Sequence, residues 1–467
     1  MLFSSIPFLF YFLPLFFVLY FAMPAKTRNI VLLVASLVFY YYGEKGYVLL
    51  LVFSSVMDYT ISLLIEKYRG TKKAKAALLV SIIGNLLILG FFKYSDFFIG
   101  NLNTLLNVSI PLLRVHLPLG ISFYTFQTMS YTIDVYRGDA TPKRSPLDFA
   151  AYVTMFPQLV AGPIVRYQTV ANELTNRKHT WEGFASGATR FIIGMGKKVL
   201  IANTLGELNR AALTTSNHSA LFYWLAIVSF MLQIYFDFSG YSDMAIGLGR
   251  ILGFNFLENF NYPFIAKSIS EFWQRWHISM GTWFREYIYI PLGGNRVSKL
   301  KWVRNIAVVW FVTGLWHGAA WNFIFWGLFF GVILAFEKLF FMKWLQKTPD
   351  VVRRLYVLLL VTVSFVIFHL ENAADIMEYL KGMAGLMDVP AVNSESVYYL
   401  RSYGFVLILA IFGATPILRN LVIKASRYPK AQAAVDALTP VFNVVLLMVV
   451  AAYLVDSSFN PFLYFRF

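Results

Sequence analysis

The chain of 467 residues contains no cysteine. This absence excludes thiol nucleophiles, disulfides, iron–sulfur clusters and thiolate metal sites, and it leaves the redox compartment undetermined. Charge is scarce too, because only 14% of the residues are charged, whereas a soluble domain carries about 25%. The chain also has no glycine-rich phosphate loop, no HExxH and no GxSxG motif. No metal site is expected, since no two histidines share helical spacing.

Hydrophobic residues make up 58% of the chain and aromatic residues 18%, and the mean hydropathy is +0.61. A helix needs about 20 apolar residues to cross a bilayer. The runs do not alternate apolar and polar residues as the strands of a membrane barrel do, so the sequence predicts an all-α polytopic membrane protein. The candidate runs are 6–23, 30–42, 47–65, 76–92, 184–202, 221–238, 306–336, 355–370, 403–417 and 441–455.

The formal net charge of +16 indicates loop orientation rather than nucleic-acid binding, because basic loops of membrane proteins stay in the cytoplasm. No lysine or arginine precedes the first apolar run, and Lys26 and Arg28 follow it. This charge order is the reverse of that in a signal peptide. We therefore expect a retained first span with the N-terminus outside.

Three basic loops and one acidic segment extend this orientation. The segment 371–401 holds five acids against Lys381 and Arg401, so it is predicted to lie outside, followed there by the C-terminus. The basic positions, predicted to be cytoplasmic, are Lys67, Arg69, Lys72, Lys73 and Lys75, then Lys338, Lys343, Lys347, Arg353 and Arg354, then Arg419, Lys424, Arg427 and Lys430.

Residues 110–304 contain short apolar pieces interrupted by proline and glycine, among them Pro118, Pro157 and Gly240. Irregular backbone at membrane depth requires surrounding protein or water, so we expect re-entrant segments and half-helices around a cavity. No internal repeat of the transporter type is visible. Residues 1–467 are therefore expected to form a single integral-membrane domain.

Residues 299–304 and 338–347 are both basic, so the chain between them is expected to enter the membrane and return. Arms of about 12–16 residues rise only about 18–24 Å, less than the ~30 Å apolar core. The turn near 317–322 is then predicted to lie inside the membrane or at the floor of an outer depression.

His317 is the histidine that we expect to do chemistry, because an imidazole among apolar residues is costly to bury and can move protons near neutral pH. Gly314 and Gly318 allow close approach. Trp310, Gly314, His317 and Trp321 recur at helical spacing as one aromatic-lined stripe, and Asn322 supplies an amide that could orient the ring or a carbonyl. The alternative is a buried structural histidine.

Residues 270–277 are predicted to form an amphipathic helix in which Trp273, Trp276 and His277 share one face and Glu271 pairs with Arg275. The alternative for both tryptophans is an interfacial helix at headgroup depth. Downstream, a Gly–Gly turn at 293–294 has basic flanks. Arg285 and Arg296, with Lys299 and Lys301, could bind the phosphates of a cytoplasmic donor or anchor to anionic lipid.

Intramembrane polar residues are expected to face the interior of the helix bundle, because a charge at the bilayer centre costs about 2.5–3.5 kcal/mol. The densest group lies in 235–243, where it could line a cavity or tie helices together, and the tie is favoured. The residues concerned are Asp58, Gln127, Asp134, Gln233, Asp237 and Asp243.

Several motifs, taken together and in order, resemble the membrane-bound O-acyltransferase family, most closely its bacterial branch that includes the membrane subunit of alginate O-acetylation. The likeness spans nearly the whole chain. Met280 stands where the family motif is expected to have leucine, a mild apolar exchange. The motifs are PLGISFYTFQ at 118–127, DVYRG at 134–138, FPQLVAGPI at 156–164, WHIS at 276–279, GLWHG at 314–318 and YFRF at 464–467.

The resemblance implies a fold of about eleven transmembrane helices, with re-entrant and short amphipathic helices, around a central tunnel. It implies a catalytic role for His317 and a second role for His277. We expect Asn322, Trp316 and Trp276 to support these two residues.

The resemblance further implies an acyl thioester donor, acetyl-CoA or a charged carrier protein, with no tightly bound cofactor. The acceptor would be a hydroxyl of an exopolysaccharide or cell-wall glycan, reached with an extracytoplasmic SGNH-hydrolase-like partner. The enzyme itself would lie in the bacterial cytoplasmic membrane. D-alanyl transfer to teichoic acid is the alternative within the family. A glycan or lipid transporter and a scaffold are alternatives of other classes.

Overall fold

The computed structural model describes residues 1–215 and 217–456, and these residues form helices and connecting segments without any β-strand. The predicted all-α class is therefore confirmed. The YFRF motif at 464–467 lies outside the described residues. Two compact units can be distinguished, one made of residues 1–191 and 244–257 and the other of the described residues of 192–243 and 258–467.

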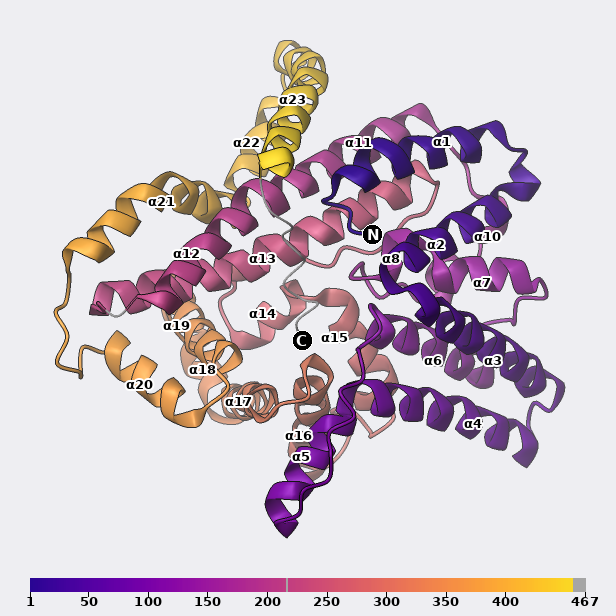
Figure 1. Ribbon diagram of the computed structural model, residues 1–467, viewed down its shortest axis with the longest axis horizontal. Coiled ribbons are helices and arrows are strands. Elements are labelled where there is room, and N and C mark those ends of the chain that lie inside the picture. The colour runs from indigo at the N-terminus through magenta and orange to yellow at the C-terminus, as the bar shows by residue number, and fades with distance from the viewer. Residues whose placement is uncertain (216, 457–467) are drawn as a thin grey trace. The chain divides into compact units, whose positions relative to one another are not determined.

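The first unit contains the N-terminal helices (Figure 1). It also includes the start of α11 (Trp181–Gly196) and the end of α13 (Ala220–Ile251). Its helices are α1 (Leu13–Ala22), α2 (Arg28–Glu44), α3 (Val48–Lys67), α4 (Lys72–Leu89), α5 (Ser95–Leu106), α6 (Ile121–Arg137), α7 (Pro146–Thr154), α8 (Phe156–Leu159), α9 (Tyr167–Val170) and α10 (Glu173–Asn176).

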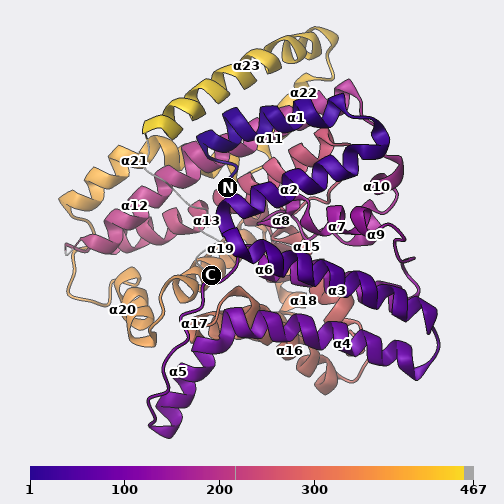
Figure 2. The same cartoon turned by 45° about the vertical axis from the view of Figure 1, so that its right-hand side comes forward.

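An aromatic cluster and a buried polar cluster hold the first unit together. The Phe156 ring lies 5.4 Å from Phe12 and 5.1 Å from Phe16, edge-on to both, in the geometry that aromatic pairs prefer. Helices α3, α4 and α6 pack side by side (Figure 2). Between them the fully buried Asp58 accepts hydrogen bonds from Ser81 (2.6 Å) and Asn85 (2.8 Å). Asp58 thus faces the interior, as predicted.

The second unit contains the remaining helices, with a π-helical segment, Lys197–Ala202, between α11 and α12. They are α12 (Asn203–Thr214), most of α13, α14 (Ile269–Arg275), α15 (Ile278–Phe284), α16 (Lys299–His317), α17 (Trp321–Phe336), α18 (Met342–Leu345), α19 (Asp350–His369), α20 (Ala373–Met383), α21 (Ser394–Gly413), α22 (Ile417–Ala425) and α23 (Pro429–Asp456).

Helix α13 supplies much of the buried core of the second unit, which side chains of α12, α14, α16, α17 and α19 complete. The predicted break of the chain at Gly240 is wrong, because α13 runs through it without interruption. A Cβ at Gly240 would lie 2.7 Å from the carbonyl oxygen of Gly194. This glycine therefore serves the close packing of two chain segments and not a turn.

Seven helical segments are long and apolar enough to cross a membrane by length and composition, within the part of the chain that the structure describes. The ten apolar runs predicted from the sequence fall mostly on helices, although the run 306–336 is interrupted at 318–320 and the run 403–417 extends beyond the end of α21 at Gly413. Short helices in the middle of the chain are also confirmed, since α8, α9 and α10 have four residues each and α14 and α15 have seven. Helices such as α1, α3, α4, α21 and α23 expose many large apolar side chains, as contact with lipid requires.

Candidate active site

The α16–α17 hairpin places His317 at the end of its first helix. Helix α16 ends at His317, and α17 begins at Trp321 after an extended connection through Gly318 and Ala320. The predicted turn is confirmed. Helix α16 has 19 residues, but the first six carry the basic Lys299, Lys301 and Arg304, and α17 has 16 residues. The apolar arms therefore rise about 20–24 Å, and the depth of the turn stays a prediction.

Glycines allow the two helices of this hairpin to approach closely. A Cβ at Gly314 would lie 2.3 Å from the carbonyl oxygen of Phe323, and one at Gly327 would lie 2.3 Å from that of Trp310. No side chain fits at such distances, so the backbones touch here. The predicted stripe along one helix stops at His317, since Trp321 belongs to α17 and is 51% exposed.

The His317 ring lies in a pocket of aromatic side chains and is 5% exposed. Its centroid is 4.8 Å from the ring of Trp326, 5.1 Å from that of Trp316 and 5.8 Å from that of Phe368. All three contacts are edge-to-face, with interplanar angles of 78°, 78° and 81°. Rings from α16, α17 and α19 therefore fix the plane of the imidazole.

Asn322 is buried beside this pocket, but its contact differs from the expected one. Its amide nitrogen donates to the backbone carbonyl of Phe368 at 3.1 Å, one of the last carbonyls of α19, which lack partners within the helix. Its Oδ1 is buried and has no hydrogen-bond partner among the described residues. Asn322 thus holds Phe368, one wall of the pocket, and has no hydrogen bond to the His317 ring.

His277 lies between two helices and not on the face of one. Helix α14 ends at Arg275, Trp276 is extended, and His277 adopts a left-handed conformation (φ 46°) before α15. The helix predicted over 270–277 therefore begins one residue earlier and ends two residues earlier than expected. Its internal pair is confirmed, with Arg275 and Glu271 2.9 Å apart.

Asn259 fixes the position of the His277 ring. Its Oδ1 accepts from the backbone N–H of Ser279 (3.2 Å) and from the Ser279 hydroxyl (2.9 Å), and it lies 3.2 Å from Nδ1 of His277. The bond from the Ser279 N–H identifies this atom as the amide oxygen, which can only accept hydrogen bonds. Nδ1 of His277 is therefore assigned as the protonated nitrogen, and Nε2 of the neutral ring carries the lone pair. The Asn259 amide in turn donates to Ser242 at 3.1 Å.

Trp316 brings the two histidines together. Its indole lies 5.1 Å from the His317 ring and 5.9 Å from the His277 ring. The His277 side chain is completely buried and packs edge-on against Phe238 at 4.6 Å. The two imidazoles therefore share one aromatic wall.

Trp276 and Trp273 belong to the interior, so the interfacial alternative is wrong for both. Trp276 stacks on Phe272 at 5.6 Å and is buried, and Trp273 meets Trp310 edge-on at 4.7 Å. Both lie in or against the core of the second unit.

Arg285 and Arg296 are both exposed. Arg285 forms an ion pair with the adjacent Glu286 at 2.7 Å. Arg296 follows the Gly–Gly turn, where the predicted conformation is confirmed by positive φ angles of 100° at Gly293 and 56° at Gly294. The buried Asn305 donates to the carbonyls of Leu292 and Gly294, both at 3.1 Å, and stabilises this turn.

The polar group at 235–243 forms ion pairs with two consecutive lysines. Lys198 pairs with Asp237 at 2.5 Å, with side chains 5% and 2% exposed, and Lys197 pairs with Asp243 at 2.6 Å. These pairs connect the π-helical segment to α13, which agrees with the predicted tie between helices. Gln127 and Asp134 are buried, also as predicted.

Sequence reasoning missed the residues that complete the site: Asn259, Ser279, Phe238, Trp326 and Phe368. Trp326 and Phe368 sit in apolar runs and resemble ordinary core residues. Asn259 belongs to an irregular segment 18 residues before His277, and no spacing rule connects the two.

The site therefore offers two buried imidazoles, each with a fixed ring, and both next to the same indole. A neutral imidazole can take a proton from a hydroxyl, and an aromatic surround excludes water from a reactive ester.

Comparisons with known proteins identify the family of this chain. The model of the membrane-bound O-acyltransferase family matches residues 140–377, a range that contains both histidines. The chain is 39% identical over 499 residues to the probable alginate O-acetylase AlgI of Azotobacter vinelandii, and the alignment covers 100% of both chains. It is 33% identical over 514 residues to the peptidoglycan O-acetyltransferase of Helicobacter pylori, covering 100% of this chain and 98% of that one.

A third relative is matched over a shorter range. The teichoic acid D-alanyltransferase of Bacillus subtilis is 32% identical over 245 residues, which cover 49% of this chain and 60% of that one. The family match spans half of the chain and contains both histidines, and the first two relatives are matched over their full length or nearly so. This multi-pass membrane protein therefore belongs to the membrane-bound O-acyltransferase family.

Proposed function

We propose that this membrane acyltransferase moves an acyl group, most simply acetyl, from a cytoplasmic thioester to hydroxyls of an extracytoplasmic polysaccharide. The two relatives matched over nearly their whole length are named for O-acetylation of alginate and of peptidoglycan, both glycans. D-alanyl transfer from a carrier protein is the alternative within the family. It has less support, because that relative is matched over only half of this chain.

The observation that carries the proposal is the buried His317 ring, which three aromatic side chains hold in place. His317 acts as general base. It takes the proton of the acceptor hydroxyl while the oxygen attacks the thioester carbonyl; the new C–O bond forms, the C–S bond breaks, and the imidazolium returns its proton to the leaving thiolate. General-base catalysis of this kind contributes about 10²–10⁴-fold. No acyl–histidine intermediate is required.

His277 positions or polarises the donor thioester in this proposal. Trp316 contacts both imidazoles and would line the path of the acyl group between them. Trp276 fixes the chain before His277 through its packing on Phe272. Asn322 acts through Phe368. Arg285 and Arg296, which are exposed, would bind phosphates of a coenzyme A donor.

Residues 1–467 work as one integral domain in the bacterial cytoplasmic membrane, with both termini outside. The acceptor is reached directly or through an SGNH-hydrolase-like partner outside the membrane. A tunnel between donor and acceptor sides would let the acyl group cross without the donor.

The test replaces His317 by alanine in the native host and measures acyl ester on the surface polysaccharide. We expect ester to fall by about 10²-fold or more while the amount of protein in the membrane stays constant. His116→Ala is the matched control, because that histidine is largely exposed and pairs only weakly with Glu44, at 3.6 Å. Unchanged acylation in the His317→Ala strain would rule out the catalytic assignment.

A second measurement separates the alternatives. Purified protein in liposomes is given radiolabelled acetyl-CoA or a D-alanyl carrier protein, with a glycan acceptor inside. Cleavage of the thioester and formation of ester identify the donor, whereas a transporter would move solute without either reaction.

A further inference from the structure

Two arginines and one histidine meet at the ends of α1 and α2 in the first unit, and the proposed function does not use them. Nη1 of Arg28 lies 3.1 Å from Nδ1 of His179, and Nε2 of His179 lies 3.1 Å from the Tyr20 hydroxyl. Nε of Arg177 donates to the same hydroxyl at 2.8 Å. The guanidinium groups also pack on the Tyr20 ring, each 5.6 Å from its centroid.

The hydrogen bonds determine the charge of this cluster. A guanidinium can only donate, so Nδ1 of His179 must accept from Arg28, and the ring proton sits on Nε2, facing Tyr20. Burial and the charges of Arg28 and Arg177 lower the pKa of His179 to about 4, so the ring is neutral at pH 7. The cluster therefore carries two positive charges.

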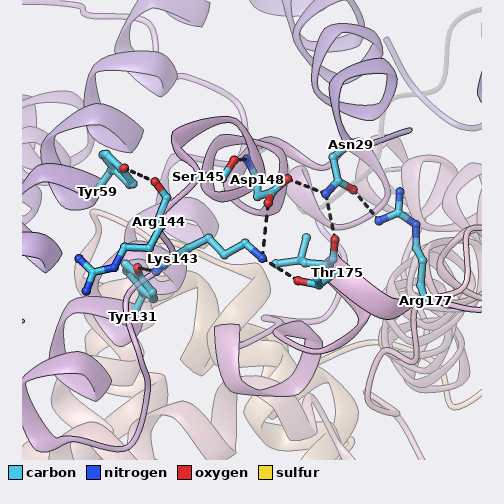
Figure 3. A network of polar contacts seen from close by, with 10 residues as sticks. Asn29, Tyr59, Tyr131, Lys143, Arg144, Ser145, Asp148, Thr175 and Arg177 are labelled. Carbon is cyan, nitrogen blue, oxygen red and sulfur yellow. Dashed lines mark hydrogen bonds and ion pairs between the residues drawn. The ribbon is translucent and has the colours of Figure 1, made fainter. Parts of the chain in front are cut away.

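No carboxylate compensates these two charges within the part of the chain that the structure describes. Asp148 is nearest in the network, but it pairs with Lys143 at 3.4 Å and accepts from Asn29 at 2.7 Å. Figure 3 shows Asn29 between Asp148 and the Arg177 guanidinium, which donates to the Asn29 amide oxygen at 2.5 Å.

Arg177 also has an unsatisfied donor. Its Nη2 is buried and has no hydrogen-bond partner among the described residues. A buried N–H without an acceptor is costly, and for a charged group the cost is larger. An acceptor of negative charge would satisfy both the unused donor and the uncompensated charge.

The surroundings of the cluster have the features of a membrane–water boundary. The apolar helix α1 ends at Ala22, and α2 begins at Arg28. The Trp181 side chain at the start of α11 is 84% exposed, and Lys26 and Lys178 are exposed beside the arginines. Tryptophan, lysine and arginine gather at headgroup depth, and the N-terminus of a helix favours an anion.

We propose that Arg28 and Arg177 bind the phosphate of an anionic phospholipid. Guanidinium groups suit this ligand because their paired donors match two phosphate oxygens. A lipid fits better than a soluble phosphate, since α1 presents the exposed apolar side chains of Leu15, Val18 and Leu19 for acyl chains. The proposal is independent of the catalytic roles assigned to His277 and His317.

The test titrates the purified full-length protein with dioleoyl phosphatidylglycerol and measures bound lipid by native mass spectrometry. Phosphatidylcholine with the same tails and inorganic phosphate are the comparison ligands. We expect phosphatidylglycerol to bind about tenfold more tightly than phosphatidylcholine, and Arg28→Gln or Arg177→Gln to weaken its binding about tenfold. Arg28→Lys should lose less, because the charge remains. Lys75→Gln, an exposed basic residue elsewhere in the first unit, is the matched control and should leave binding unchanged.

Three outcomes would overturn the proposal. The first is equal binding of phosphatidylglycerol and phosphatidylcholine by the wild-type protein. The second is wild-type affinity in a folded Arg28→Gln variant, with folding checked by its melting temperature. The third is displacement of phosphatidylglycerol by millimolar inorganic phosphate, which would identify a site for a soluble anion. If Arg177→Gln does not fold because Tyr20 and Asn29 lose their partner, the Arg28 variants decide the question.

Discussion

Trp316 contacts both His277 and His317, which lie 40 residues apart in the sequence. Its indole contacts both rings, and each ring has its own support: Asn259 for His277, and Trp326 with Phe368 for His317. Fixed rings matter because a general base works only from a position within hydrogen-bond reach of its proton. The residues that hold the imidazoles should therefore affect activity without touching substrate.

Asn259→Ala tests this role. The change removes the acceptor for Ser279 and His277 and should destabilise the protein by about 1–3 kcal/mol. It should also lower acyl transfer per folded molecule about 10- to 100-fold, because the His277 ring is no longer held in place. The measurement is initial rate against protein concentration, with folded protein quantified by gel filtration in detergent.

Ser242→Ala is the matched control for this change. It removes only the acceptor of the Asn259 amide and leaves the contacts to His277 and Ser279 in place, so the rate should fall much less. A full rate in folded Asn259→Ala would show that the orientation of His277 does not matter for transfer.

The motifs single out the two histidines as candidates, but they do not predict that the two rings lie on one indole. Periodicity extends a helix through 270–277, and nothing in the spacing indicates that His277 adopts φ 46°. That conformation turns the side chain away from the face of α14. His277 then lies close to Trp316 only because the segment before α15 packs against the end of α16. A local sequence pattern carries no information about such a contact between distant segments.

At the scale of elements, the α16–α17 hairpin is the rigid support of the site. The two backbones touch at Gly314 and Gly327, and η8 (Glu337–Phe341) extends α17. There the buried Glu337 carboxylate accepts from the backbone N–H of Ile269 at 2.8 Å. This contact connects the hairpin to the start of α14, the helix that leads to His277.

Gly314→Ala should disrupt this support. The new methyl group would lie 2.3 Å from the Phe323 carbonyl oxygen, so the helices must separate and the His317 ring must move with α16. We expect a loss of about 1–3 kcal/mol of stability together with a large loss of activity, measured as melting temperature and transfer rate.

Gly404→Ala on α21 is the control for Gly314→Ala, since nothing lies within 4 Å of its Cβ position. An alanine there should stabilise the helix by up to about 1 kcal/mol and leave activity unchanged. Wild-type stability and rate in Gly314→Ala would mean that the hairpin tolerates a wider separation than its backbone contact indicates.

The elements were predicted to different degrees for a physical reason. Apolar runs identify helices well, because a chain in lipid must satisfy its own backbone hydrogen bonds. Glycine gave the wrong signal at Gly240, where it permits close packing inside α13, and the right one at the Gly293–Gly294 turn. The residue type alone does not separate these two uses.

At the scale of the whole molecule, the absence of cysteine makes the predicted topology directly testable, because each introduced thiol is the only one in the chain. Lys75→Cys, Arg427→Cys and Glu371→Cys each replace an exposed side chain. If basic loops are cytoplasmic, a membrane-impermeant maleimide should label Glu371→Cys in intact spheroplasts. Lys75→Cys and Arg427→Cys should react only after the membrane is permeabilised.

The cysteine-free parent controls for background. Labelling of Lys75→Cys in intact spheroplasts would reverse the orientation and move the proposed donor side outward, where no cytoplasmic thioester could reach it.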